Sequence, residues 1–188
     1  LSDEVKERIT GISYPESGCT VPYEDLHYVG LLYVDFNGET QTGELICNKA
    51  IAQDMVEIFY ELYLNDYRIE RIRLIDEYGG DDTLSMEDNN TSCFNYRVVD
   101  GTDSLSKHAL GCAIDINPFY NPYVVFNRPT QGETYISPKG SEIYADRSRN
   151  IMPIVSKGFF CFLIASPPLS AHQNSHMGQG GTVSTEKF

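Results

Sequence analysis

The stretch "LSKHALGCAIDINP", residues 105–118, decides how the rest of the sequence is interpreted. It contains a histidine, His108, and an aspartate, Asp115, on either side of small residues and in otherwise apolar surroundings. In a β-strand, residues 112–117 would alternate between two faces, so Asp115 and Asn117 would leave the apolar side. The pattern therefore predicts that Asp115 faces a cleft.

A histidine and an aspartate placed in this way are candidate zinc ligands. Zinc binds imidazole nitrogen and carboxylate oxygen, and a catalytic site keeps three protein ligands and one open position. His108 and Asp115 could supply two of them, and the small residues Gly111 and Ala113 would let the backbone pass close to a metal. The structural alternative is that His108 caps a turn and Asp115 accepts backbone hydrogen bonds. The spacing leaves both interpretations open.

The segments before this motif predict a hairpin and a helix. Residues 28–48 have a turn signal at Asn37-Gly38 between two apolar runs, which is typical of a β-hairpin. Asn48 can cap a helix that runs to about Asn65. Apolar residues at helical spacing would form its buried face: Ile51, Met55, Ile58, Phe59 and Leu62. We expect this helix to cover the sheet.

The remaining segments give weaker signals. We expect a strand over residues 67–78, a long polar loop over residues 79–107 and an irregular, proline-containing excursion over residues 117–135. Asn89 and Asn90 both match the N-glycosylation tripeptide, and we interpret these as chance matches.

Composition excludes several classes of protein. The chain has 188 residues, enough for one globular domain with a sizeable core. Its 27 acidic and 14 basic residues give a net charge of −13, which argues against nucleic acid as a partner. The longest apolar run, residues 158–165, is too short for a transmembrane helix. The five cysteines form no C-x-x-C pair, and we expect Cys47, Cys93 and Cys112 to be buried thiols.

Residues 105–118, together with their surroundings, closely resemble the M15 family of zinc D,D-carboxypeptidases and L-alanyl-D-glutamate endopeptidases. The family signature S-x-H-x-x-G-x-A-x-D is matched at every fixed position, by Ser106, His108, Gly111, Ala113 and Asp115. The resemblance extends from "GELICNKAIAQDMVEIFYELY" to "YADRSR", which ends at Arg149. It implies an α+β fold of the Hedgehog/D,D-peptidase type, in which helices pack on one side of a small antiparallel sheet and the zinc cleft lies on the other.

The resemblance also implies the chemistry. His108 and Asp115 would be ligands of Zn²⁺, and Arg97 in "FNYR" matches the arginine that the family uses to bind substrate and stabilise an oxyanion. A guanidinium remains charged at any working pH and donates several hydrogen bonds in a fixed geometry, so it suits that role. The alternative for Arg97 is a structural salt bridge with a nearby acid. The implied reaction is hydrolysis of a peptide bond in a bacterial peptidoglycan stem peptide.

The C-terminal end departs from the family pattern. Family members end with an acidic residue shortly before a histidine, which are the general base and the third ligand. Here His172 and His176 have no Asp or Glu nearby, and Glu186 is the one acidic residue after Asp146. Either the reading frame is lost between residues 149 and 158, or the ending is divergent and His176 or His172 reaches the metal.

We therefore divide the chain into a peptidase domain, residues 1–157, and an atypical C-terminal segment, residues 158–188. The leading interpretation is a monomeric zinc metallopeptidase of the cell envelope or extracellular space, with no export signal in this chain and with activity that depends on the ending. The rival is a catalytically degenerate module that binds peptidoglycan peptides. A Hedgehog-like interaction domain is a third possibility.

Overall fold

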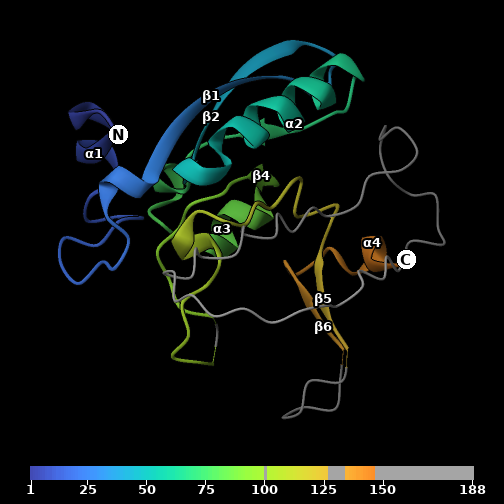
Figure 1. Ribbon diagram of the computed structural model, residues 1–188. Coiled ribbons are helices and arrows are strands. Elements are labelled where there is room, and N and C mark those ends of the chain that lie inside the picture. The colour runs from blue at the N-terminus through green and yellow to red at the C-terminus, as the bar shows by residue number, and fades with distance from the viewer. Residues whose placement is uncertain (100, 127–133, 147–188) are drawn as a thin grey trace, which may run out of the picture.

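The computed structural model describes residues 1–99, 101–126 and 134–146 and shows a mixed arrangement of helices and strands (Figure 1). The α-helices are α1 Asp3–Ile9, α2 Ala52–Leu64, α3 Asp82–Glu87 and α4 Glu142–Ala145. The strands are β1 Leu26–Val34, β2 Thr40–Asn48, β3 Arg71–Ile72, β4 Asn90–Thr91, β5 Tyr123–Val125 and β6 Tyr135–Ser137. Short 3-10 turns are η1 Tyr23–Asp25, η2 Lys49–Ile51, η3 Ile75–Tyr78 and η4 His108–Leu110.

The α+β fold class is thus confirmed. The strands form three two-stranded pairs, of which β1–β2 and β5–β6 are antiparallel and β3–β4 is parallel. The more specific Hedgehog/D,D-peptidase topology stays a prediction, and the expected boundary between residues 157 and 158 lies outside the described residues.

The predicted hairpin is the longest sheet structure in the described part of the chain. Leu26 pairs with Asn48 and Val34 pairs with Thr40, so the two strands match along their full length. The turn places Gly38 at a φ of 89°, which glycine adopts without strain. The carboxylate of Asp35 accepts hydrogen bonds from the turn amides, as expected of an aspartate at the start of such a turn.

Helix α2 covers one face of this hairpin, as Figure 1 shows. The side chain of Asn48 accepts a hydrogen bond from the amide of Ala50 at 3.0 Å and so begins the helical segment through η2. Met55, Phe59 and Leu62 are buried and join the main core, whereas Ile58 is only partly buried. Each fully buried side chain of this size stabilises the fold by about 1.5–3 kcal/mol. The predicted helix and its apolar face are confirmed.

A second core lies between α1 and the other end of the hairpin. Val5 and Ile9 of α1 pack there with Leu26, Ile46 and other buried residues. Phe94 belongs to this second core, while its neighbour Cys93 belongs to the main core. The chain at Cys93 and Phe94 is therefore fixed from two sides.

The strand expected over residues 67–78 is wrong in extent, because only β3 is a strand there and η3 follows it. The reason is that buried side-chain amides replace strand partners. The amide of Glu70 donates to Asn117 Oδ1 at 3.0 Å, and that of Arg73 donates to Asn90 Oδ1 at 2.9 Å.

The long polar loop expected over residues 79–107 contains α3 and β4. Asp81 caps α3, since its carboxylate accepts from the amide of Leu84 at 3.0 Å. Asn89 and Asn90 are buried, which agrees with their interpretation as chance glycosylation matches.

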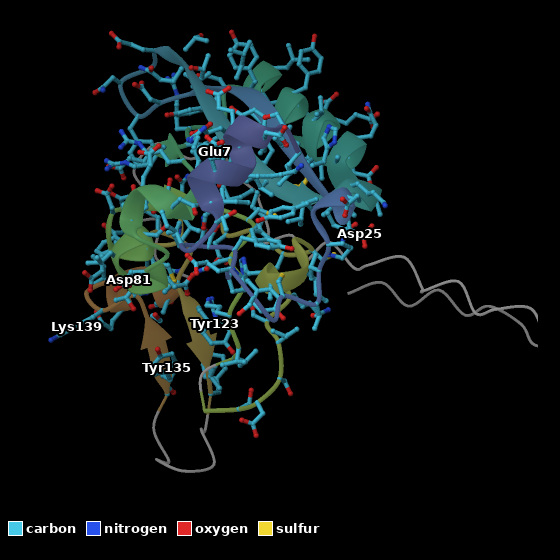
Figure 2. All side chains as sticks on the ribbon, turned by 90° about the vertical axis from the view of Figure 1, so that its left-hand side faces the viewer. Glu7, Asp25, Asp81, Tyr123, Tyr135 and Lys139 are labelled. Atoms are coloured by element: carbon cyan, nitrogen blue, oxygen red, sulfur yellow. The ribbon has the colours of Figure 1, made fainter. Side chains whose placement is uncertain are left out.

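The excursion expected over residues 117–135 also contains regular structure. Strand β5 pairs with β6, and Figure 2 shows Tyr123 and Tyr135 on these two strands. Pro122 directly precedes β5, where a missing amide proton removes no ladder hydrogen bond.

Three of the cysteines are buried free thiols, as predicted. Cys47, Cys93 and Cys112 are at most 8% exposed. Burial raises the pKa of Cys47 to about 12 and that of Cys93 well above its ordinary value. Cys47 and Cys93 therefore stay protonated, and all three cysteines are small core residues.

Turn η4, which carries His108, ends at Gly111 and lies directly against the end of β2. The amide of Asn48 donates to the carbonyl of Gly111 at 2.8 Å. Gly111 has a φ of 64°, and a Cβ atom there would lie 2.6 Å from the Asn48 nitrogen and 2.9 Å from the Cys47 carbonyl carbon. Glycine is thus required both by conformation and by close backbone contact.

Replacing Gly111 by alanine is expected to lower the free energy of unfolding by about 2–4 kcal/mol, because left-handed strain and a backbone clash add together. Gly79 is a matched control, since its φ is 65° and a Cβ atom there would meet no other atom within 4 Å. Gly79→Ala should cost only about 1 kcal/mol from strain alone. Urea unfolding of both variants measures the difference, and equal losses would contradict the close-contact explanation.

Candidate metal centre

The segment from Ser92 to Arg97 is the backbone support of the signature motif. Ser92 and Asp115 exchange backbone hydrogen bonds of 3.2 and 3.0 Å. The amide of Asn95 donates to the carbonyl of His108 at 3.2 Å, and the amide of Ser106 donates to that of Arg97 at 2.9 Å. One short segment thus holds both candidate ligands in place.

The ring of His108 is oriented by a carbonyl group. Its Nδ1 atom lies 2.7 Å from the carbonyl oxygen of Cys93. A carbonyl only accepts hydrogen bonds, so Nδ1 carries the proton and a neutral ring has its lone pair on Nε2. Histidines that bind metals are commonly fixed in this way by a hydrogen bond from the other ring nitrogen.

The Nε2 atom of His108 faces the carboxylate of Asp115 at 3.3 Å from Oδ2. Two zinc ligands with bonds of about 2.0–2.2 Å at a tetrahedral angle lie about 3.3–3.6 Å apart, so the donor pair fits one zinc ion. A protonated imidazole would instead form an ion pair at the same distance. Without a metal ion or a proton, the lone pairs of Nε2 and Oδ2 would face each other and repel, so this pair of atoms needs a cation or a proton between them.

Ser106, the first residue of the signature, has a structural role. Ser106 is buried, and its hydroxyl oxygen accepts from the amide of His108 at 3.2 Å. The Ser106 hydroxyl thus holds the amide at the start of η4, and the His108 side chain does not take that role.

The strand predicted for residues 112–117 is wrong, because only an isolated bridge between Asp115 and Ser92 forms there, and the predicted alternation is only partly confirmed. Cys112 and Ile114 are buried and Asp115 is 32% exposed at its side chain, as expected. The prediction that Asn117 leaves the apolar side is wrong, because this residue is buried and only 1% exposed. The backbone there leaves strand geometry with a φ of 46°, and the Asn117 side chain accepts and donates hydrogen bonds inside the protein.

Arg97 forms the ion pair that the structural alternative predicted. Its Nη2 atom donates to Oδ2 of Asp82 at 2.6 Å. Its Nε atom is buried and has no hydrogen-bond partner within the described residues. A buried donor without an acceptor is rare in native proteins. The Arg97 side chain as a whole is 31% exposed, so other parts of it face solvent.

Asp82 is a residue of this region that the sequence did not reveal. Burial raises the pKa of its carboxyl, while the charge of Arg97 opposes this rise. The charges of His108 and Asp115 also act on it, in opposite directions. Asp82 therefore lies close enough to the candidate metal pair to belong to the same electrostatic environment. Only its place in the first turn of a capped helix could have been inferred from sequence.

The third ligand remains a prediction. His176 and its neighbour His172 lie outside the described residues. Within the ranges that the structure describes, no group of three or more His, Cys, Asp or Glu side chains could hold a metal ion. This part of the chain therefore supplies two oriented donors, His108 and Asp115.

One of the comparisons with known proteins gives a match to a part of the chain. A family model described as D-alanyl-D-alanine carboxypeptidase matches residues 100–159. The search of curated proteins found no match, and neither did the search of solved structures. The matched range contains the complete signature from Ser106 to Asp115 but not Arg97. The predicted resemblance to the M15 family of peptidases is thus confirmed over residues 100–159, the range that the family model matches.

Proposed function

We propose that this chain is a zinc-dependent metallopeptidase that hydrolyses a peptide bond in peptidoglycan stem peptides. The observation that carries the proposal is the facing pair of His108 Nε2 and Asp115 Oδ2 at 3.3 Å. The hydrogen bond between His108 Nδ1 and the Cys93 carbonyl leaves Nε2 free for a metal ion. The family match over residues 100–159 supports a peptidase.

In this proposal His108 and Asp115 hold the metal and His176 completes the ligand set. A bound zinc ion would polarise the scissile carbonyl and provide a water nucleophile near neutral pH. The backbone of residues 92–97 fixes both described ligands through hydrogen bonds to Asp115 and His108 before any metal binds. A donor pair arranged in advance loses little conformational entropy on binding.

Arg97 is the substrate-binding or oxyanion-stabilising residue of the proposal. Its side chain is 31% exposed, so part of the guanidinium is open to a carbonyl oxygen or carboxylate of the substrate, whereas its Nε–H is buried. The chain has a net charge of −13, which would repel an anionic peptide end. The partly exposed guanidinium of Arg97 provides the local positive charge that such a substrate needs.

The description of the matching family favours a bond between two D-alanine residues as the substrate. Cleavage of an L-alanyl-D-glutamate bond is the other possibility within the resemblance. Either substrate places the protein in the cell envelope or outside the cell. No helix in the described part of the chain is long and apolar enough to span a membrane. We expect the protein to act as a monomer.

A second candidate function is a degenerate module that binds stem peptides without cutting them. It is favoured by the absence of a third metal-binding side chain within the described ranges. It is also favoured by the lack of an acidic residue near His172 and His176. Two ligands alone would hold zinc weakly, so metal affinity separates the two candidates. Resequencing the coding DNA beyond Arg149 tests whether a shifted frame restores an acid before a histidine.

Zinc content tests the ligand assignment. His108→Ala and Asp115→Ala should each weaken zinc binding by more than about 100-fold, because each removes a direct ligand. His27→Ala is the control, since His27 is exposed on β1 and should leave binding unchanged. Zinc per chain is measured by elemental analysis after dialysis against a metal buffer. Unchanged zinc in the His108 variant would refute the assignment, and equal loss in His176→Ala would identify the third ligand.

Hydrolysis of a peptide ending in D-alanyl-D-alanine tests the reaction. Arg97→Ala should lower kcat/KM by about 100- to 1,000-fold while zinc content stays the same, since one oxyanion donor is lost. Arg73→Ala is the control, because Arg73 forms an exposed pair with Glu77. A chelator should abolish release of D-alanine, and added zinc should restore it. Full activity after chelation would overturn zinc dependence.

A further inference from the structure

We propose that Asp82 is a positioning residue that holds the guanidinium of Arg97 in its working orientation. This inference rests on the proposed function of Arg97 but goes beyond the M15 signature, which includes neither residue. Asp82 does not touch the substrate in this proposal. It acts through Arg97.

The contact itself is short and partly sheltered from water. Arg97 Nη2 lies 2.6 Å from Asp82 Oδ2, and the two side chains are 31% and 23% exposed. Charge-assisted hydrogen bonds of this length are stronger than neutral ones, and partial burial reduces screening by salt. No other ion pair of Arg97 occurs among the described residues. Asp82 therefore provides the main side-chain restraint on a long and otherwise flexible side chain.

The backbone beneath Asp82 is well fixed. The Asp81 side chain caps α3 through the amide of Leu84 at 3.0 Å. Ser85 is 1% exposed, and its hydroxyl oxygen accepts from Asn90 Nδ2 at 3.0 Å. Because α3 is tied down on both sides of Asp82, its carboxylate provides a fixed point for Arg97.

The ion pair engages one nitrogen of the guanidinium and leaves the Arg97 side chain 31% exposed. Asp82 occupies Nη2, whereas the buried Nε has no partner in the described part of the chain. Oδ2 of Asp82 is taken up by the contact with Arg97, so we assign Asp82 to positioning rather than to general base catalysis. It also balances the charge of Arg97 at a partly buried position.

A double-mutant cycle tests this coupling on the full chain. Asp82→Ala should lower kcat/KM for the D-alanyl-D-alanine peptide by about 10- to 100-fold, with zinc content unchanged. In the Arg97→Ala background the same change should have almost no further effect, because the side chain that it positions is gone. Losses that multiply in the double variant would overturn the proposal.

Asp81→Asn is the matched control. It removes a neighbouring negative charge, but asparagine also caps helices well, so activity should stay unchanged. Asp82→Asn keeps the shape of the side chain and guards against misfolding of the alanine variant. It should cause a smaller loss, since an amide oxygen can still accept one hydrogen bond. A full loss of activity in Asp81→Asn would show that α3 as a whole, and not the Asp82 contact, is responsible.

A readout without catalysis separates this proposal from the proposed function. The Nε–H group of Arg97 gives its own nitrogen resonance, and its heteronuclear NOE reports how rigid the side chain is. The NOE should be high in the wild type and in Asp81→Asn, and clearly lower in Asp82→Ala. An unchanged NOE in Asp82→Ala overturns the positioning role. Wild-type protein that cleaves nothing, but shows this drop, would refute the proposed function and retain the contact between Asp82 and Arg97 as a positioning device.

Discussion

The hydrogen bond between the His108 ring and the carbonyl of Cys93 is the interaction on which the candidate site depends. It fixes the proton on Nδ1 and turns Nε2 toward Asp115. The carbonyl is itself immobile, because the Cys93 side chain is buried in the main core and that of Phe94 is buried in the second core. The orientation of a candidate ligand is therefore a consequence of packing in two separate cores. A change in either core would alter the site without touching a ligand.

Asn48 connects the same site to the hairpin and to helix α2. Its side-chain oxygen accepts from the amide of Ala50, and its side-chain nitrogen donates to the carbonyl of Leu110 at 3.1 Å. Its backbone amide donates to the carbonyl of Gly111. Asn48, the last residue of β2, thus begins the following helical segment through its side-chain oxygen. Its side-chain nitrogen and its backbone amide hold the turn that carries His108. The glycine of the signature is explained by this contact, because any side chain at Gly111 would separate the turn from β2.

The sequence predicted those parts of the fold that depend on local patterns. The hairpin follows from the Asn37-Gly38 turn, and α2 follows from the Asn48 cap and its apolar period. The parts that were wrong depend on side-chain amides that replace backbone partners over long distances, as Asn117 does for Glu70. No local pattern reveals such contacts. His108, Asp115 and Arg97 were found through the family signature and its neighbourhood, whereas Asp82 is brought to Arg97 only by the folded chain.

The hydrogen bonds that orient the two candidate ligands do not depend on the unusual C-terminal end of the chain. The hydrogen bonds that orient His108 and Asp115 come from described residues before position 127, so these two donors are arranged without help from His172 or His176. A third ligand would therefore add to a pair that is already in place. Its loss would lower metal affinity by removing one bond, but it would leave the orientation of His108 unchanged. The same holds for Arg97, because its ion pair with Asp82 does not involve the C-terminal end. If Arg97 binds peptide as proposed, a chain with this architecture would keep that cation even where metal binding is weak, and a peptidase site could persist as a binding site.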